Sequence, residues 1–90
     1  MLKKYKSKIG FVFVSAVEAT KEFIDSPPKY LMDDTLNTFL QKSGNKLYLY
    51  NKLDGDSYPV EEGDHVGYNE KDELSVWDGE IFKNGFKEIR

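Results

Sequence analysis

Residues 46–77, KLYLYNKLDGDSYPVEEGDHVGYNEKDELSVW, decide the fold of this 90-residue chain. The stretch opens on a strict alternation, in which Leu47 and Leu49 share one face of an extended chain. Tyr48 and Tyr50 then share the other face. A period of two is typical of a strand with one face in the core, so we expect the leucines to be buried.

Two turn regions divide the rest of this stretch into strands. Residues 53–64 concentrate glycine, aspartate and proline, which favour turns. We expect a strand to begin near His65, residues 69–73 to turn the chain, and residues 74–77 to return as the partner strand. Residues 79–89, GEIFKNGFKEI, then predict a turn or short helix followed by a last short strand.

The N-terminal part predicts one strand and one short helix. Residues 9–17 are a β-branched and aromatic run, which indicates a buried first strand. Ser15 and Glu18 have the spacing of a capping box, so a short helix is expected over about 18–25, before Ser-Pro-Pro stops it.

The main helix is expected over about residues 29–42. Apolar residues recur there three to four positions apart, at Met32, Leu36, Phe39 and Leu40. Gly44 is interpreted as the end of this helix. The whole pattern predicts a small α+β fold in a single domain, residues 1–90, with a mostly antiparallel sheet, this main helix and one or two short helices.

Composition restricts the classes of protein. The chain is 39% hydrophobic and 32% charged, which is too apolar for a disordered chain and too polar for a membrane span. There is no cysteine, so disulfides and thiolate metal sites are excluded. A secretory-signal interpretation of the N-terminus is disfavoured, because its apolar run is short and suits a strand.

Four lysines stand among the first eight residues: Lys3, Lys4, Lys6 and Lys8. One interpretation is that they keep the apolar strand after them from pairing with other chains. The other is an arm that contacts phosphates, but lysines without arginine or glycine between them are a weak nucleic-acid signal. Nucleic acid is therefore not expected as the partner.

Residues 61–80 hold the only histidine, the only tryptophan and eight carboxylates. His65 alone cannot supply the imidazole ligands of a zinc site. Asp54 and Asp56 lack the remaining ligands of a calcium loop, and no nucleophile elbow or phosphate loop is present. We therefore expect no catalytic residues, no metal, no cofactor and no enzymatic activity, and we expect Trp77 to lie in the core.

With catalytic and metal sites not expected, the remaining class of function is binding of a partner at the protein surface. Two surfaces are candidates for the binding site. The first is Tyr48 and Tyr50 beside Lys46, with Tyr68 as a further candidate, because exposed tyrosines are common at interfaces. The same tyrosines favour a homo-oligomer, with a dimer preferred. The second is the acidic stretch 61–80, which is either a solvated hairpin or a surface for a basic partner.

Six short stretches stand in the order found in a family of small uncharacterised tailed-phage and prophage proteins. They are VSAVE (14–18), PKYL (28–31), LDGD (53–56), EGDHV (62–66), ELSVW (73–77) and EIFKNGFKEI (80–89). The chain resembles that family over most of its length. It departs from the family pattern at Glu62, where proline is usual, at His65, where an aromatic residue is usual, and after Trp77, where Cys-Lys-Pro is missing.

The resemblance implies a viral origin and action in the host cytoplasm, without a membrane partner and without assigned catalytic residues. We therefore expect a non-enzymatic phage accessory protein that binds a host component. The expected role is to inhibit a bacterial anti-phage defence system, either by occluding a host defence protein or by sequestering a signalling nucleotide. The alternatives are a small nucleic-acid-binding protein that uses the N-terminal lysines and a minor virion or assembly protein.

Overall fold

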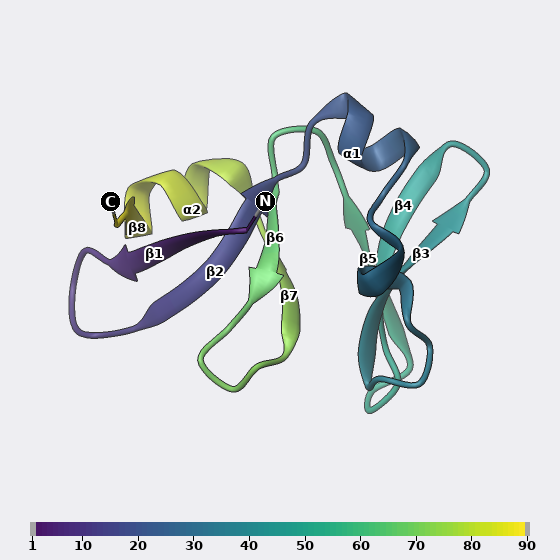
Figure 1. Ribbon diagram of the computed structural model, residues 1–90, viewed down its shortest axis with the longest axis horizontal. Helices are drawn as coiled ribbons and strands as arrows, with labels where there is room; N and C mark the ends of the chain where they lie inside the picture. The colour runs from purple at the N-terminus through teal and green to yellow at the C-terminus, as the bar shows by residue number, and fades with distance from the viewer. Residues whose placement is uncertain (1, 90) are drawn as a thin grey trace.

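The structure is a computed structural model that describes residues 2–89. Two antiparallel sheets dominate it (Figure 1). The larger sheet has the strand order β7-β6-β2-β1-β8 and the smaller has the order β3-β4-β5. The strands are β1 (Lys3–Ser7), β2 (Phe13–Glu18), β3 (Thr38–Ser43), β4 (Lys46–Asn51), β5 (Asp56–Val60), β6 (His65–Tyr68), β7 (Leu74–Trp77) and β8 (Phe86–Glu88), and the helices are α1 (Lys21–Asp25), the 3-10 turn η1 (Lys29–Met32) and α2 (Gly79–Gly85).

One hydrophobic cluster joins the two sheets. Strands of both sheets contribute to it, together with α1 and η1, and its members are Ala19, Phe23, Leu31, Leu40, Leu47, Leu49, Val60, Val66 and Leu74. Figure 1 shows the smaller sheet to one side of the larger one, with α1 at the top of the junction. The two sheets therefore share a core, which a chain of this size needs because it buries little surface.

A second, smaller cluster lies on the other face of the larger sheet. Val14 and Ala16 of β2 pack there against Phe82, which α2 places over the sheet. Trp77 and Phe86 pack around this cluster and stay partly buried. Helix α2 thus covers part of the face, and the uncovered part borders the site described below.

The central prediction of a mostly antiparallel α+β fold is confirmed. Strand β4 has the predicted bounds, and Leu47 and Leu49 are buried while Tyr48 and Tyr50 are half-buried on the opposite face. Strands β6 and β7 also form the predicted hairpin, with His65 paired to Trp77. In the part of the chain that the structure describes, no helix has the length and apolarity needed to cross a membrane.

The expected main helix over 29–42 is wrong. Only the short turn η1 forms there, and Thr38–Ser43 is strand β3. The Asp33 carboxylate accepts hydrogen bonds from the backbone N–H and the hydroxyl of Thr35, at 3.0 and 2.6 Å. Such local bonds favour a turn over a helix, so the chain leaves η1 before a second helical turn can form.

The cause of this error is the role of Gly44. Gly44 and Asn45 form a two-residue hairpin loop between β3 and β4, with Ser43 paired to Lys46 across it. The φ of Gly44 is 61°, which the primed turns of such hairpins require. The apolar spacing of residues 29–42 fits a helix, but pairing with β4 buries Leu40 beside Leu49 and decides the structure.

The strand and the short helix predicted near the N-terminus both form, but each begins later in the sequence than predicted. The strand expected at 9–17 is β2, which begins at Phe13, and the lysine-rich residues before it form a further strand, β1. The helix expected at 18–25 is α1, which begins at Lys21. Thr20 caps α1 by accepting a hydrogen bond from the N–H of Phe23, so the capping box expected at Ser15 and Glu18 does not form.

Strand β5 lies inside the region expected to be a turn. Its Pro59 pairs with Tyr48 and sits on an edge strand, where the missing N–H breaks no sheet ladder. Asp54 shapes the preceding turn by accepting hydrogen bonds from the Asp56 N–H and the Tyr58 hydroxyl. Gly55 and Gly63, which the sequence indicated as turn residues, both have positive φ, at 74° and 95°.

Candidate functional site

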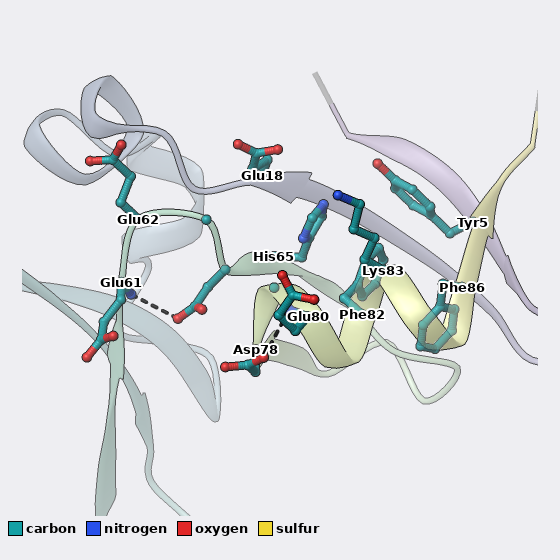
Figure 2. A pocket seen from close by; sticks show the side chains of 13 residues that line it. Tyr5, Glu18, Glu61, Glu62, His65, Asp78, Glu80, Phe82, Lys83 and Phe86 are labelled. Atoms are coloured by element: carbon teal, nitrogen blue, oxygen red, sulfur yellow. Dashed lines mark hydrogen bonds between the residues drawn. The ribbon is translucent and has the colours of Figure 1, made fainter.

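A cleft of about 550 Å³ lies where α2 leaves part of the larger sheet uncovered (Figure 2). Segments far apart in the sequence line it, namely β1, the end of β2, the turn before β6, and α2 with the start of β8. The lining residues are Tyr5, Glu18, Glu61, Glu62, Gly63, Asp64, His65, Asp78, Gly79, Glu80, Phe82, Lys83 and Phe86. Its volume is within the range of roughly 300–1,000 Å³ found for ligand clefts.

The floor of the cleft is aromatic. The His65 ring stacks on Phe82 at 4.2 Å between ring centroids and 12° between planes. The Tyr5 ring meets the edge of both, at 4.8 Å from Phe82 and 5.9 Å from His65. Phe86 stacks on Phe82 from β8 at 4.7 Å. The imidazole is thus held flat as part of an aromatic cluster.

Six carboxylates and one lysine surround this floor. Two of the carboxylates have structural roles. Asp64 accepts a hydrogen bond from the N–H of Glu61 at 2.9 Å, and Asp78 caps α2 by accepting from the N–H groups of Glu80 and Ile81. The remaining four, Glu18, Glu61, Glu62 and Glu80, are exposed at the rim (Figure 2).

Close backbone packing fixes the position of the acidic turn against α2. A Cβ built on Gly79 would stand 2.4 Å from the carbonyl oxygen of Gly63. Only glycine at the first position of α2 lets the helix start this close to the turn. The rim carboxylates of the turn and of the helix are therefore held on two sides of one opening.

Burial shifts the pKa values of the two polar rings in the floor. Burial lowers the pKa of His65, and the carboxylates of Glu18 and Asp64 raise it by less. Burial also raises the pKa of Tyr5, with smaller contributions from the charges of Glu88 and Glu18. The Nδ1 atom of His65 is buried and has no hydrogen-bond partner among residues 2–89. His65 is therefore a neutral packing residue near pH 7.

The arrangement suits recognition of a positive group. No set of three His, Asp or Glu side chains among residues 2–89 converges as metal ligands do. The Ser75 hydroxyl accepts a hydrogen bond from the Asn69 amide and donates one to the Glu73 carbonyl, and Ser75 does not line the cleft. What the cleft does offer is negative charge around an apolar aromatic floor, the combination that attracts and stacks a cationic side chain.

The site residues expected from the sequence lie elsewhere. Lys46, Tyr48 and Tyr50 all belong to β4, and the two tyrosines lie on its outer face, where Tyr50 meets the Phe39 ring at 5.5 Å. Tyr68 belongs to the larger sheet and packs against the shared cluster. The structure thus brings the β4 residues together and leaves Tyr68 apart from them.

A second cavity borders the β4 group. It measures about 680 Å³, and its lining includes Tyr48, Gln41 and Ser57. Lys3, Lys4 and Lys6 lie in strand β1, and the Lys3 ammonium is 4.0 Å from the Glu88 carboxylate. The two interpretations of the N-terminal lysines, protection of the apolar strand and contact with phosphates, both stay predictions.

Sequence reasoning found the acidic part of the cleft and missed the rest. The density of carboxylates in residues 61–80 was the available signal. Tyr5 and Glu18 carried no signal, since nothing in the local pattern shows that β1 and β2 will lie beside α2. Phe82 was expected only as an apolar residue of a turn or short helix.

Comparisons of the chain with protein-family models, with curated proteins and with solved structures found no match. The resemblance to the phage family therefore stays a prediction.

Proposed function

We propose that this chain is a non-enzymatic binding protein that holds a basic segment of a host protein in its acidic cleft. The observation that carries the proposal is the joining of six carboxylates to an aromatic floor in one opening. Together with the resemblance, it favours a phage accessory protein that acts in the host cytoplasm and blocks an anti-phage defence protein by occlusion.

An arginine side chain fits the chemistry of this cleft best. A guanidinium is planar and weakly hydrated, so it stacks on aromatic rings and pairs with carboxylates through its fork of donors. Tyr5 and His65 provide ring surface, Glu18 stands above the His65 ring, and Glu62 lies to one side on the acidic turn (Figure 2). Lys83 offsets only part of the negative charge of the opening.

The same charges disfavour the other expectations at this site. A signalling nucleotide carries phosphates, which the rim carboxylates repel, so occlusion of a protein is preferred to sequestration of a nucleotide. Nucleic acid is disfavoured there for the same reason. The alternative role as a virion or assembly protein has no feature of the cleft in its favour.

A titration tests the cleft as a receptor. The probe is an unstructured peptide of six arginines, added to the isotope-labelled protein, and the readout is the shift of backbone amide signals. We expect the signals of Glu18, Asp64 and His65 to move and the affinity to fall as salt rises, because surface charges are screened. A hexaglutamate peptide is expected to leave these signals in place.

Charge-matched variants make the titration specific. The cleft variant is Glu18→Gln, Glu62→Gln and Glu80→Gln, and its control is Glu22→Gln, Asp34→Asn and Glu70→Gln, three exposed carboxylates outside the cleft. We expect the arginine peptide to lose affinity by about tenfold or more with the cleft variant only. Equal losses in both variants would reduce the binding to net charge and contradict the proposal.

The biological arm uses infected or defence-expressing cells. We expect the wild type and the control variant to copurify with one host protein and to relieve phage restriction, and the cleft variant to do neither. Full relief by the cleft variant would refute occlusion through this site.

A further inference from the structure

The turn between β1 and β2 displays apolar side chains in solvent. Ile9 is 92% exposed and Phe11 is 82% exposed, and Phe13 at the start of β2 is 54% exposed. These are the residues that the sequence placed in a buried strand. Soluble chains rarely leave several large apolar side chains together without a use for them. We call residues 6–13 the basic hairpin tip.

The tip has a defined conformation. The N–H of Ser7 donates to the carbonyl of Val12 at 2.8 Å, and the N–H of Val12 donates to the Ser7 hydroxyl at 3.1 Å. Two hydrogen bonds tie Lys8 of the tip to α2. The backbone N–H of Lys8 donates to the carbonyl of Gly85 at 2.9 Å, and the Lys8 ammonium donates to the carbonyl of Lys83. The apolar side chains of the tip are therefore presented in advance, which lowers the entropic cost of binding.

The charge of the tip selects the kind of surface it can meet. The ammonium of Lys6 lies 4.9 Å from the centre of the Phe11 ring, and Lys6 stands directly opposite Lys87 in the pairing of β1 with β8. Like charges in opposite positions destabilise a sheet. Two tips would repel one another, so the partner surface must be acidic and must also accept apolar side chains.

The acidic cleft is such a surface, and it is present on every copy of the chain. We propose that the basic hairpin tip of one molecule docks into the acidic cleft of a second copy. Phe11 would lie against the aromatic floor, and Lys6, whose ammonium lies beside the Phe11 ring, would face the rim carboxylates. This proposal rests on the proposed function, since both treat the cleft as a receptor for basic groups.

The conformation of the tip keeps it away from the acidic end of the cleft in its own molecule. Lys8 is bonded to Gly85 at the C-terminal end of α2, whereas Asp78 and Glu80 of the cleft lie at its N-terminal end. Figure 1 shows the β1–β2 turn extending away from the N-terminal end of α2. The contact is therefore between different surfaces of two molecules, which builds rings or open chains rather than a symmetric pair.

Sharing the cleft has a consequence for regulation. A tip from a neighbouring molecule and a basic segment of a host protein exclude each other. Self-association would mask the cleft at high concentration of the free protein, and a tighter partner would displace the tip.

The test is sedimentation velocity over a range of concentrations, from a monomer mass of 10.4 kDa. The tip variant is Ile9→Ser and Phe11→Ser, which changes exposed side chains and should fold as the wild type does. Its control is Leu53→Ser, a residue 71% exposed in the β4–β5 turn. The cleft variant and its charge-matched control are those of the peptide titration.

We expect the wild type and both controls to associate, more weakly at high salt, and the tip and cleft variants each to associate about tenfold or more weakly. The decisive step is a mixture of the two variants. One molecule then retains a working tip and the other a working cleft, so an equimolar mixture should form a one-to-one complex.

A wild type that stays monomeric, or a mixture of variants that does not associate, overturns the inference. If the arginine peptide still binds the cleft in that case, only the self-contact fails and the proposed function stands. If the arginine peptide also fails to bind the cleft, both the self-contact and the proposed function are refuted. Displacement of the tip by the arginine peptide, seen as a fall in sedimenting mass, would support both.

Discussion

The second face of the larger sheet packs against a helix, α2, whereas the outer face of the smaller sheet buries one large side chain, Phe39. In the larger sheet, Val66 lies in the shared core and Ala16 lies under α2 on the opposite face. In the smaller sheet, Leu47 and Leu49 face the shared core, while the tyrosines of β4 remain half-buried on the outer face. The sheet whose second face packs against a helix is also the one that carries the acidic cleft.

Partial cover of a sheet face is how this small domain makes a charged concave site. A helix of seven residues covers only part of a five-stranded face, and the cleft is the part that remains, deepened by the acidic turn. The cavity of about 680 Å³ beside the outer face of β4 has one carboxylate in its lining, Asp34, against six in the cleft. Partial cover by α2 gives both an apolar floor and a charged rim.

The largest expected effect on stability comes from removing the side chain through which α2 packs on the larger sheet. Phe82→Ala should lower the free energy of unfolding by about 3 to 5 kcal/mol, since Phe82 is 2% exposed and touches every other ring of the second cluster. Urea unfolding followed by Trp77 fluorescence measures it. The neighbouring Ile81→Ala, on an exposed side chain, should change stability by no more than about 0.5 kcal/mol. A loss below about 1 kcal/mol for Phe82→Ala would mean that α2 is not part of the core.

Leu47→Ala probes the face that the two sheets share. We expect a loss of about 2 to 5 kcal/mol, because Leu47 is 1% exposed in the common cluster. The two sheets should still unfold together, so tryptophan fluorescence and far-ultraviolet circular dichroism should give one midpoint. Separate midpoints would show that the smaller sheet unfolds independently and would sharpen the contrast between the sheets.

A smaller effect concerns pH and the floor of the cleft. Because burial lowers the pKa of His65, the unfolded chain takes up the proton first as pH falls. Stability from this residue is therefore present above its unfolded pKa of about 6.5 and is lost below it. His65→Phe keeps a ring on Phe82 and removes the titration. The drop in unfolding free energy between pH 7.5 and 5.5 should be smaller in this variant, and an unchanged drop would assign it to other groups.

The smallest effect is expected on the outer face of β4. Tyr48→Ser should cost less than about 1 kcal/mol, because the Tyr48 side chain is only half-buried there. The sequence indicated a dimer contact through Tyr48 and Tyr50, whereas the proposed docking of the tip into the cleft would put the contact elsewhere. The Tyr48→Ser, Tyr50→Ser protein should therefore associate as the wild type does. A monomeric double variant would return the interface to β4.

The sequence by itself determined the strands whose alternation is local. Residues 46–51 alternate without interruption, so the bounds and the buried face of β4 followed from a period of two. Residues 65–68 and 74–77 flank a turn, so their pairing as a hairpin followed from the turn residues. The sequence also indicated an acidic surface, since charge density needs no knowledge of contacts.

The tertiary structure alone decided the segments whose local pattern fits two states. Residues 38–43 have apolar spacing compatible with a helix, and they became β3 because a partner strand lay within reach across Gly44 and Asn45. Ile9 and Phe11 look like core residues and became an exposed tip because β1 and β2 pair around them. The cleft belongs to the same class, because the β1–β2 hairpin with Tyr5 and Glu18 meets Phe82 of α2 through contacts between segments distant in sequence, and local spacing carries no record of such contacts.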